Sequence, residues 1–307
     1  MTSPRIFIAG PTAAGKSEIA LALAEKIGGE IISVDSMQVY RGLDIGTAKP
    51  DAATQKKIRH HLIDVCDLTE PFDAAKFVQL AKQAVAEIQS RKKIPIFCGG
   101  TGLYFKAYLD GLGDAPPANP KLRAELEATP LEELLKELLE RDPAAYEKID
   151  KKNPRRVIRA LEVIRTTGKS FSSQRANWPV HAAGQGTLYL FTRSAGDLHR
   201  RINARVDEMF RRGLAEETRE LLKHGLEENK TAMQSIGYRQ VVEHLRGRHA
   251  LPETIELVKI RTRQFAKRQL TWFRRHGNGG WTELKPEQTA QEALDIFAYR
   301  GQQGLQR

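Results

Sequence analysis

The eight residues from Gly10 to Ser17, GPTAAGKS, constrain this chain more than any other stretch, because they fit the phosphate-binding pattern G-x-x-x-x-G-K-[ST]. That pattern requires a strand before it and a helix after it. Arg5 to Ala9 is an apolar run typical of a buried strand, and apolar residues recur at helical spacing from Ile19 to Ile27. The flanks predict a P-loop, in which backbone N–H groups and the helix dipole attract linked phosphates, Lys16 adds a charge and Ser17 offers a hydroxyl to Mg²⁺.

A second strand is predicted from Glu30 to Val34, so the chain opens with a strand–helix–strand unit whose strands are parallel neighbours. Asp35, Ser36, Met37 and Gln38 follow at the carboxyl end of that strand, the edge where open α/β sheets bind ligands. Asp35 is either a turn or capping aspartate or a functional carboxylate. Its position favours the functional interpretation.

A later strand, Ile94 to Cys98, ends in Gly99, Gly100, Thr101 and Gly102. P-loop proteins that hydrolyse nucleotides carry an acidic residue at the end of such a strand to hold Mg²⁺. Because glycines and Thr101 stand there instead, the sequence argues against nucleotide hydrolysis.

The adjacent histidines His60 and His61 open a further predicted strand that continues to Val65. Neighbouring side chains on a strand point to opposite faces, and no third ligand lies at a plausible spacing. A structural or hydrogen-bonding role is therefore favoured over a metal site.

From Pro116 the pattern becomes helical, with a Leu/Glu-rich helix over Leu131 to Leu139 and another that begins with Asn153 as its N-cap. Strand character returns from Thr187 to Thr192. The sequence therefore predicts an α/β fold with two parts. A P-loop NTPase-like parallel sheet core spans residues 1–115 and 184–307, and an all-helical insertion spans residues 116–183. In the core, Asp197 is expected to cap the helix that follows the returning strand.

The formal net charge of +11 and the pI near 9.6 favour a polyanionic partner. Positive charge without acidic interruption runs along one long helix, with aromatic residues between the cations, a pattern typical of nucleic-acid binding rather than of a merely solvated face. Its members are Lys259, Arg261, Arg263, Phe265, Lys267, Arg268, Trp272, Phe273, Arg274 and Arg275.

Two further pairs of arginines lie on predicted helices, and the members of each pair are four residues apart, on one side of the helix. Arg155 and Arg159 belong either to a solvated face or to a contact with a phosphate backbone. Arg201 and Arg205 belong either to a solvated face or to a helix side aimed back at the P-loop.

The chain has only two cysteines, Cys66 and Cys98, so neither a zinc ribbon nor a disulfide framework is available. No stretch has the length of a signal-peptide apolar region or a membrane span. We expect a soluble cytoplasmic monomer with no membrane partner.

Five blocks together resemble the bacterial tRNA dimethylallyltransferases, also called tRNA isopentenyltransferases, of the IPP transferase family. The second block, DSMQVYRGLDIGTAKP, is far longer than a P-loop and is not a general nucleotide-binding signature. The eukaryotic relatives carry an additional C-terminal zinc finger that two cysteines cannot form. The blocks are Gly10 to Ser17, Asp35 to Pro50, His60 to Asp64, Gly99 to Tyr104 and Ser235 to Gln240.

The resemblance implies transfer of the dimethylallyl group from dimethylallyl diphosphate to an adenosine N6 amine in tRNA, with release of diphosphate. The adenosine is 3′-adjacent to the anticodon in tRNAs that read codons beginning with U. Catalytic residues implied by the resemblance are Asp35 as the base, Thr101 and Arg205. Arg201 is a possible support, the cofactor is Mg²⁺ on Ser17, and the tRNA partner binds through its anticodon stem-loop.

The same resemblance implies two sets of binding residues. Those for diphosphate are Gly10, Pro11, Thr12, Ala13, Ala14, Gly15, Lys16, Ser17 and Arg205. Those for tRNA are Asp35, Ser36, Met37, Gln38, Thr101, Arg123, Arg155, Arg156, Val157, Ile158, Arg159, Gln234, Ser235, Ile236, Gly237, Tyr238, Arg239, Arg268, Gln269, Leu270, Thr271, Trp272, Phe273, Arg274 and Arg275.

Two other functions share parts of this pattern. A P-loop small-molecule or nucleoside kinase would use the loop with ATP, but the missing acid after Cys98 argues against it. A non-catalytic RNA-binding protein switched by phosphates would explain the basic helix, but it leaves Asp35 without a function.

Overall fold

The computed structural model describes residues 4–112, 116–174, 186–277, 279–295 and 297. The chain divides into two compact units. One consists of Met1–Leu109 and His181–Arg307, and the other of Asp110–Val180. None of the described helices has both the length and the apolar character needed to cross a membrane.

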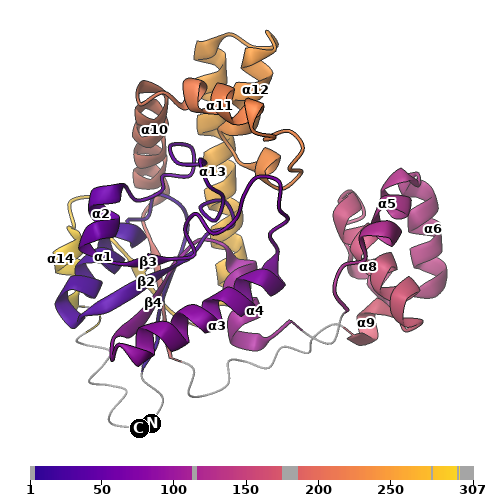
Figure 1. Ribbon diagram of the computed structural model, residues 1–307, viewed down its shortest axis with the longest axis horizontal. Coiled ribbons are helices and arrows are strands. Elements are labelled where there is room, and N and C mark those ends of the chain that lie inside the picture. Colours follow the sequence, from indigo (N-terminus) through magenta and orange to yellow (C-terminus); the bar gives the residue numbers. More distant parts are fainter. Residues whose placement is uncertain (1–3, 113–115, 175–185, 278, 296, 298–307) are drawn as a thin grey trace. The chain divides into compact units, whose positions relative to one another are not determined.

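The first unit is built on a six-stranded sheet in the order β3-β2-β4-β1-β5-β6 (Figure 1). All five neighbouring pairs are parallel, and β1, the strand before the P-loop, lies between β4 and β5. The predicted P-loop-like parallel sheet is confirmed. The strands are β1 (Ile6–Ala9), β2 (Gly29–Val34), β3 (His60–His61), β4 (Ile94–Gly99), β5 (Thr187–Thr192) and β6 (Gly280–Glu283).

Side chains alternate between the two faces of the sheet, and each face has its own core. On β1, Phe7 and Ala9 belong to one cluster and Ile8 to the other. Helices α1 (Lys16–Ile27) and α14 (Ala290–Ala293) pack on the Ile8 side. Helices α3 (Ala74–Ser90) and α4 (Gly102–Asp110) pack on the Phe7 side. The sheet is therefore buried on both faces, as expected for parallel strands.

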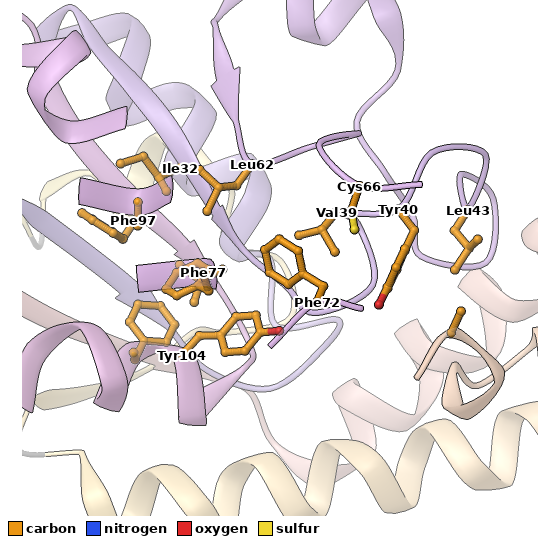
Figure 2. Packing of buried hydrophobic residues seen from close by; sticks show 14 of the residues in the cluster. Ile32, Val39, Tyr40, Leu43, Leu62, Cys66, Phe72, Phe77, Phe97 and Tyr104 are labelled. Atoms are coloured by element: carbon orange, nitrogen blue, oxygen red, sulfur yellow. The ribbon is translucent and has the colours of Figure 1, made fainter. Parts of the chain in front are cut away.

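The cluster on the Phe7 side extends beyond the sheet into the segment that follows β2. Figure 2 shows Phe77 and Tyr104 beside Phe97, and Val39 and Tyr40 further along the same cluster. The rings of Phe77 and Tyr104 are stacked, with centroids 4.4 Å apart. Burial of Val39 and Tyr40, both 0% exposed, fixes the chain directly after Asp35–Gln38.

The C-terminal part of this unit adds a group of helices, of which α10 packs on α13, α11 on α12 and α12 on α13 (Figure 1). Their bounds are α10 (Ala195–Arg211), α11 (Leu214–Lys223), α12 (Tyr238–Leu245) and α13 (Leu251–His276), with a short 3₁₀ turn at Ala232–Gln234. A short helix α2 (Ala52–Lys57) follows the loop after β2.

The described residues of the second unit form helices and their connections, with no strand among them. Its core consists mainly of leucine, isoleucine and valine side chains, with Leu126, Leu138 and Leu161 fully buried. The predicted start of the insertion at Pro116 falls inside the unit, and residues 175–183 of that prediction lie outside the described residues. The helices are α5 (Pro120–Ala128), α6 (Leu131–Arg141), α7 (Pro143–Lys148), α8 (Pro154–Thr167) and α9 (Phe171–Gln174).

Two local predictions are wrong. The strand predicted from His60 to Val65 stops at His61, because Leu62 and Asp64 adopt positive φ angles of 62° and 55° that no strand accommodates. Helix α10 begins at Ala195, and its N-cap is Ser194, whose hydroxyl accepts from the Asp197 N–H. Asp197 lies in the first turn and is buried, because its carboxylate pairs with two arginines.

Candidate active site

The P-loop between β1 and α1 forms a concave backbone turn. Ala13 and Gly15 have positive φ angles of 63° and 93°, which turn successive N–H groups toward one centre. A Cβ at Gly10 would lie 2.1 Å from the carbonyl oxygen of Phe191 on β5, so only glycine fits where the loop leaves the sheet. The local sequence thus builds an anion cradle at the start of α1.

Lys16 is buried at the floor of this cradle, where its Nζ donates to the Pro11 carbonyl at 2.6 Å. Burial lowers the pKa of Lys16 to about 8 from its usual value near 10.5. Among the nearby charges, the Arg205 guanidinium lowers this pKa further and the Asp35 carboxylate raises it. A bound anion would relieve the desolvation of the ammonium group and hold its proton.

Helix α10 directs both predicted arginines at the P-loop. Arg201 Nε donates to the Ala13 carbonyl at 3.0 Å, and Arg205 Nη1 donates to Thr12 Oγ1 at 3.1 Å. Arg205 Nη2 also reaches the carbonyl of Thr47, at 3.5 Å, in the loop that follows β2. Burial lowers the pKa of Arg205, and the nearby Asp35 and Glu18 carboxylates oppose this shift. Because a guanidinium stays protonated in proteins, α10 supplies a fixed positive charge beside the cradle.

Asp35 uses only one of its carboxylate oxygens to stabilise the turn after β2. Oδ1 accepts from the N–H groups of Met37 at 2.8 Å and Gln38 at 3.2 Å. Within the part of the chain that the structure describes, Oδ2 accepts no hydrogen bond. The carboxylate is partly exposed, so Asp35 is a turn residue that keeps one oxygen available for a proton.

Thr101 lies on the neighbouring strand end and closes this turn. Its Oγ1 accepts from the Ser36 N–H at 3.2 Å, and its own N–H donates to the Val34 carbonyl. Gln38 faces inward instead, with Oε1 accepting from Ser33 Oγ at 2.9 Å. The structure thus brings Asp35, Thr101, Lys16 and Arg205 to one edge of the sheet, with no carboxylate where β4 ends at Gly99.

Sequence reasoning missed Arg193, which directly follows β5. Its side chain is 4% exposed, Nε donates to the Ala14 carbonyl at 3.1 Å, and Nη1 bonds both Asp197 and the Lys285 carbonyl. Arg193 therefore fastens the P-loop to the C-terminal segment. A lone arginine after a strand carries no motif, so only its place at the strand end could have drawn attention to it.

Glu217 on α11 was also missed, and it explains the buried position of Tyr238. Glu217 Oε1 accepts from the Tyr238 hydroxyl at 2.6 Å, while both carboxylate oxygens accept from the Ile45 N–H. The Tyr238 oxygen accepts from the Gly46 N–H at 3.1 Å. Burial raises the pKa of Glu217. Tyr238, expected to touch tRNA, is instead 0% exposed and holds the loop of the D-I-G-T-A-K-P block in place.

Several other residues assigned to tRNA by resemblance lie in the protein interior. Phe273, one of the aromatic residues between the cations of α13, has a ring that is 1% exposed in the main core. The remaining buried members of the set are Val157, Ile158, Ser235, Gly237 and Gln269. Those with exposed side chains are Arg155, Arg156, Gln234, Arg239, Arg268, Thr271, Arg274 and Arg275. Ser36, Met37, Leu270, Trp272 and Ile236 are partly exposed.

In the second unit, Glu162 on α8 is 0% exposed and gathers two of the predicted tRNA-binding arginines. Its Oε2 accepts from Arg123 Nη2 and from Arg159 Nη1, each at 2.7 Å. Although burial raises the pKa of Glu162, hydrogen bonds from Arg159, the Asn119 N–H and Arg123 hold it below the ordinary value. Arg123 and Arg159 are therefore half-buried structural partners of Glu162.

Helix α13 carries its basic residues in two different environments. Lys259 is 12% exposed and pairs with Asp207 and Glu256, each at 2.8 Å, and Arg263 donates to Asn203 at 2.6 Å. Arg268 lies over the exposed ring of Phe265, at 5.8 Å from its centroid. The cations with exposed side chains are Arg261, Lys267, Arg268, Arg274 and Arg275.

His60 and His61 form the short strand β3, and His61 contacts a carboxylate on the neighbouring strand. His61 Nε2 lies 2.8 Å from Glu30 Oε2, and Glu30 is 1% exposed on β2. Burial opposes ionisation of Glu30, but hydrogen bonds from Arg91, His61 and Lys93 bring its pKa to about 2. Across the described ranges, no three His, Cys, Asp or Glu side chains cluster in a way that could hold a metal ion.

Mg²⁺ at the P-loop would therefore need ligands of another kind. Ser17 lies in the first turn of α1 with an exposed side chain, directly after the buried Lys16. Mg²⁺ in phosphate sites keeps several waters and takes most other ligands from the phosphates. One hydroxyl beside an anion cradle fits that mode of binding.

The P-loop lies at the edge of a parallel sheet that is covered on both faces, and two arginines of α10 point at it. These features define a phosphate-binding protein of the α/β class. Within that class, residues 38–276 match the sequence model of the IPP transferase family. The chain belongs to this family.

Curated relatives agree over nearly the whole length. A protein named tRNA dimethylallyltransferase 1 from Trichlorobacter lovleyi is 46% identical over 293 residues, which cover 94% of this chain and 96% of the relative. A tRNA dimethylallyltransferase from Geobacillus thermodenitrificans is 42% identical over 308 residues, covering 97% and 96%.

The chain is also similar to solved structures of tRNA prenyltransferases over nearly its whole length. The full-length tRNA isopentenylpyrophosphate transferase of Bacillus halodurans has a TM-score of 0.72 and 38% identity, covering 97% of this chain and 96% of that one. A eukaryotic dimethylallyltransferase acting on tRNA has a TM-score of 0.82 and 29% identity, covering 97% of this chain and 80% of that one.

Proposed function

We propose that this protein transfers the dimethylallyl group of dimethylallyl diphosphate to the N6 amine of the adenosine 3′-adjacent to the anticodon, in tRNAs that read codons beginning with U. The coarser statement, that the chain is a prenyltransferase acting on tRNA, follows from its family and its relatives. The observation that carries the finer proposal is one arrangement at the sheet edge. A carboxylate with an available oxygen, Asp35, lies within electrostatic reach of two cations, Lys16 and Arg205, that suit a diphosphate.

The reaction makes opposite demands on the two sides of this site. The bond between the prenyl C1 and a diphosphate oxygen breaks while the bond between C1 and the adenosine N6 forms, so negative charge develops on the leaving diphosphate. Lys16, Arg205 and the P-loop N–H groups stabilise that charge. The N6 lone pair is delocalised into the adenine ring, so the amine needs a base. Asp35 Oδ2 accepts its proton, and Thr101 holds the turn that carries Asp35.

Mg²⁺ would be held by the Ser17 hydroxyl and by diphosphate oxygens. When bound, it would neutralise part of the leaving-group charge. Arg201 holds the Ala13 carbonyl and so keeps the loop in its curved form.

We infer that tRNA binds through the exposed cations of α13 and, in the second unit, through Arg155 and Arg156, since phosphate contacts need accessible positive charge. An adenine inside an anticodon loop must leave its stack to reach Asp35. The anticodon stem-loop is the proposed binding element, and the proposed form is a cytoplasmic monomer.

The kinase alternative is not favoured by the family or the relatives. A direct test is to incubate the protein with tRNA and Mg²⁺ and supply either dimethylallyl diphosphate or ATP. We expect prenylated adenosine and one diphosphate per transfer with the first compound, and no reaction with the second. Formation of ADP in step with turnover would reject the proposal.

The position of the modified base needs a separate measurement. Mass spectrometry of nuclease fragments should place the group on the adenosine that follows the anticodon, and only in tRNAs that read U-starting codons. Equal modification of a tRNA with another nucleotide at that position would contradict the proposed specificity.

A further inference from the structure

Gln269 is a buried amide on α13, a helix whose exposed side carries cations. Its side chain is 8% exposed and bonds two separate loops. Oε1 accepts from the Thr12 N–H at 2.8 Å, and Nε2 donates to the Gly100 carbonyl at 3.0 Å. Because a backbone N–H only donates and a carbonyl only accepts, a single orientation of the amide satisfies both partners. An ionised glutamate of the same length only accepts, and it would leave the Gly100 carbonyl without a donor.

The loop after β4 is shaped to receive this face of α13. A Cβ at Gly100 would lie 2.2 Å from Gln269 Nε2, and a Cβ at Gly102 would lie 2.2 Å from Cε3 of Trp272. Gln269 and Trp272 are three residues apart and therefore share one side of the helix. The two glycines let α13 contact the backbone on both sides of Thr101.

The loops that Gln269 joins carry the groups of the candidate active site. Thr12 belongs to the P-loop, and its hydroxyl accepts from Arg205. Thr101 follows Gly100 and bonds the N–H of Ser36, next to Asp35. Without Gln269, the Thr12 N–H would lose its partner, and the P-loop would lose its link to the loop after β4. Leaving this N–H without a partner costs free energy, which destabilises the loop conformation that receives the anion.

We propose that Gln269 is a positioning residue for diphosphate binding, which holds the P-loop against the loop after β4 and makes no contact with tRNA. It differs in this respect from the tRNA contact that sequence resemblance implies for its segment. Its effect on turnover rests on the proposed function, whereas its effect on diphosphate binding does not.

The test compares Gln269→Leu, which removes both hydrogen bonds at similar size, with Gln264→Leu, which makes the same change at an exposed position of α13. Calorimetry with inorganic diphosphate and Mg²⁺ should show about tenfold weaker binding for Gln269→Leu and wild-type binding for Gln264→Leu. With tRNA saturating, KM for dimethylallyl diphosphate should rise and kcat should fall. The Kd for tRNA and its salt dependence should stay at wild-type values.

A second variant reaches the same contact from the other side. Gly100→Ala places a methyl group against the amide of Gln269, which must move, and should reproduce the weaker diphosphate binding without any substitution in α13. The double variant should bind diphosphate no more weakly than the weaker single variant, because both remove one contact.

Two results would overturn the inference. One is wild-type diphosphate affinity in folded Gln269→Leu or Gly100→Ala. The other is loss of tRNA affinity in Gln269→Leu with diphosphate affinity intact. If the wild-type protein binds diphosphate but transfers nothing to tRNA, the proposed function fails while the calorimetric result for Gln269 still stands.

Discussion

Asp35 combines two roles that a single substitution can separate. Asp35→Asn keeps Oδ1 as the acceptor for Met37 and Gln38, so the turn after β2 should persist, but an amide cannot take a proton from the amine. We expect single-turnover transfer to slow by roughly 10²–10⁴-fold with tRNA saturating, while diphosphate affinity changes little. Rapid-quench measurement of prenylated tRNA provides the rate. Transfer at the wild-type rate would leave Asp35 with its role in the turn alone.

Lys16 makes diphosphate binding depend on pH. Its pKa is about 8 without ligand, because burial penalises the ammonium, and a bound anion favours the charged form and raises that pKa. Binding therefore takes up a proton once the pH exceeds 8. Affinity should be constant below that pH and fall by up to about tenfold per pH unit above it.

The ionisation of diphosphate itself also varies in this range, so a control is needed. Lys16→Met removes the titrating group and leaves only the contribution of the ligand. Isothermal titration from pH 6 to 10 should give a steeper decline for the wild type than for Lys16→Met. Parallel curves would show that the ammonium of Lys16 does not titrate in response to the anion.

At the residue scale, a sequence motif predicts the position of some side chains and not of others. The P-loop letters were sufficient to place Lys16 and Ser17, because a contiguous loop has few possible geometries. The buried positions of Tyr238 and Gln269 could not be predicted, since their partners, Glu217 and Gly100, are distant in the sequence. A resemblance identifies a segment, but burial decides which side chains of that segment reach a ligand.

At the scale of elements, two of the arginines on α8 have different surroundings. Arg159 bonds the buried Glu162, whereas Arg156 has an exposed side chain. Arg159→Ala should lower the free energy of unfolding by about 1–2 kcal/mol. The value is below that of a fully buried charged hydrogen bond, because solvent screens a partly exposed arginine. Arg156→Ala should change stability by less than about 0.5 kcal/mol.

The same pair should behave in the opposite way toward RNA. If Arg156 contacts a phosphate, Arg156→Ala should weaken tRNA binding and reduce the log–log salt slope by about 0.7–0.9. Urea denaturation and binding titrations at several salt concentrations measure the two effects. A variant at Arg156 that leaves both the affinity and the slope unchanged would remove α8 from the tRNA surface.

Elements with strong periodicity were the predictable part of the fold. β1, α1 and β4 follow from apolar runs bounded by glycine, and α8 begins at Pro154 as its N-terminal signals indicate. The short strand β6 and helix α14 have no comparable pattern. They could not be predicted, because packing against β5 and α1 stabilises them rather than their own sequence. The start of α10 was placed three residues late, since Ser194 and Asp197 are both good capping residues and only the tertiary pairing of Asp197 with Arg193 decides between them.

For the whole molecule, not every cation that contributes to the net charge of +11 is available to RNA. On α13, Lys259 is held by Asp207 and Glu256, whereas Arg275 is exposed. Arg275→Ala should reduce the log–log salt slope of tRNA binding by about 0.7–0.9, and Lys259→Ala should leave it unchanged. Equal reductions in both variants would show that the ion pairs of Lys259 open when RNA binds.

The strand order also sets a sequence of events during synthesis. β1 pairs with β5, Ile6 lying opposite Thr187, so β1 must wait until Thr187–Thr192 has been made before this neighbour exists. The core of the second unit closes among residues 122–171 and is complete earlier. The phosphate cradle is encoded at Gly10–Ser17, yet Gly10 meets the Phe191 carbonyl only when β5 has been made. Parallel pairing across such a separation is slow. The nascent protein therefore keeps one edge of β1 unpaired until β5 has been made, and an unpaired strand edge is prone to aggregate.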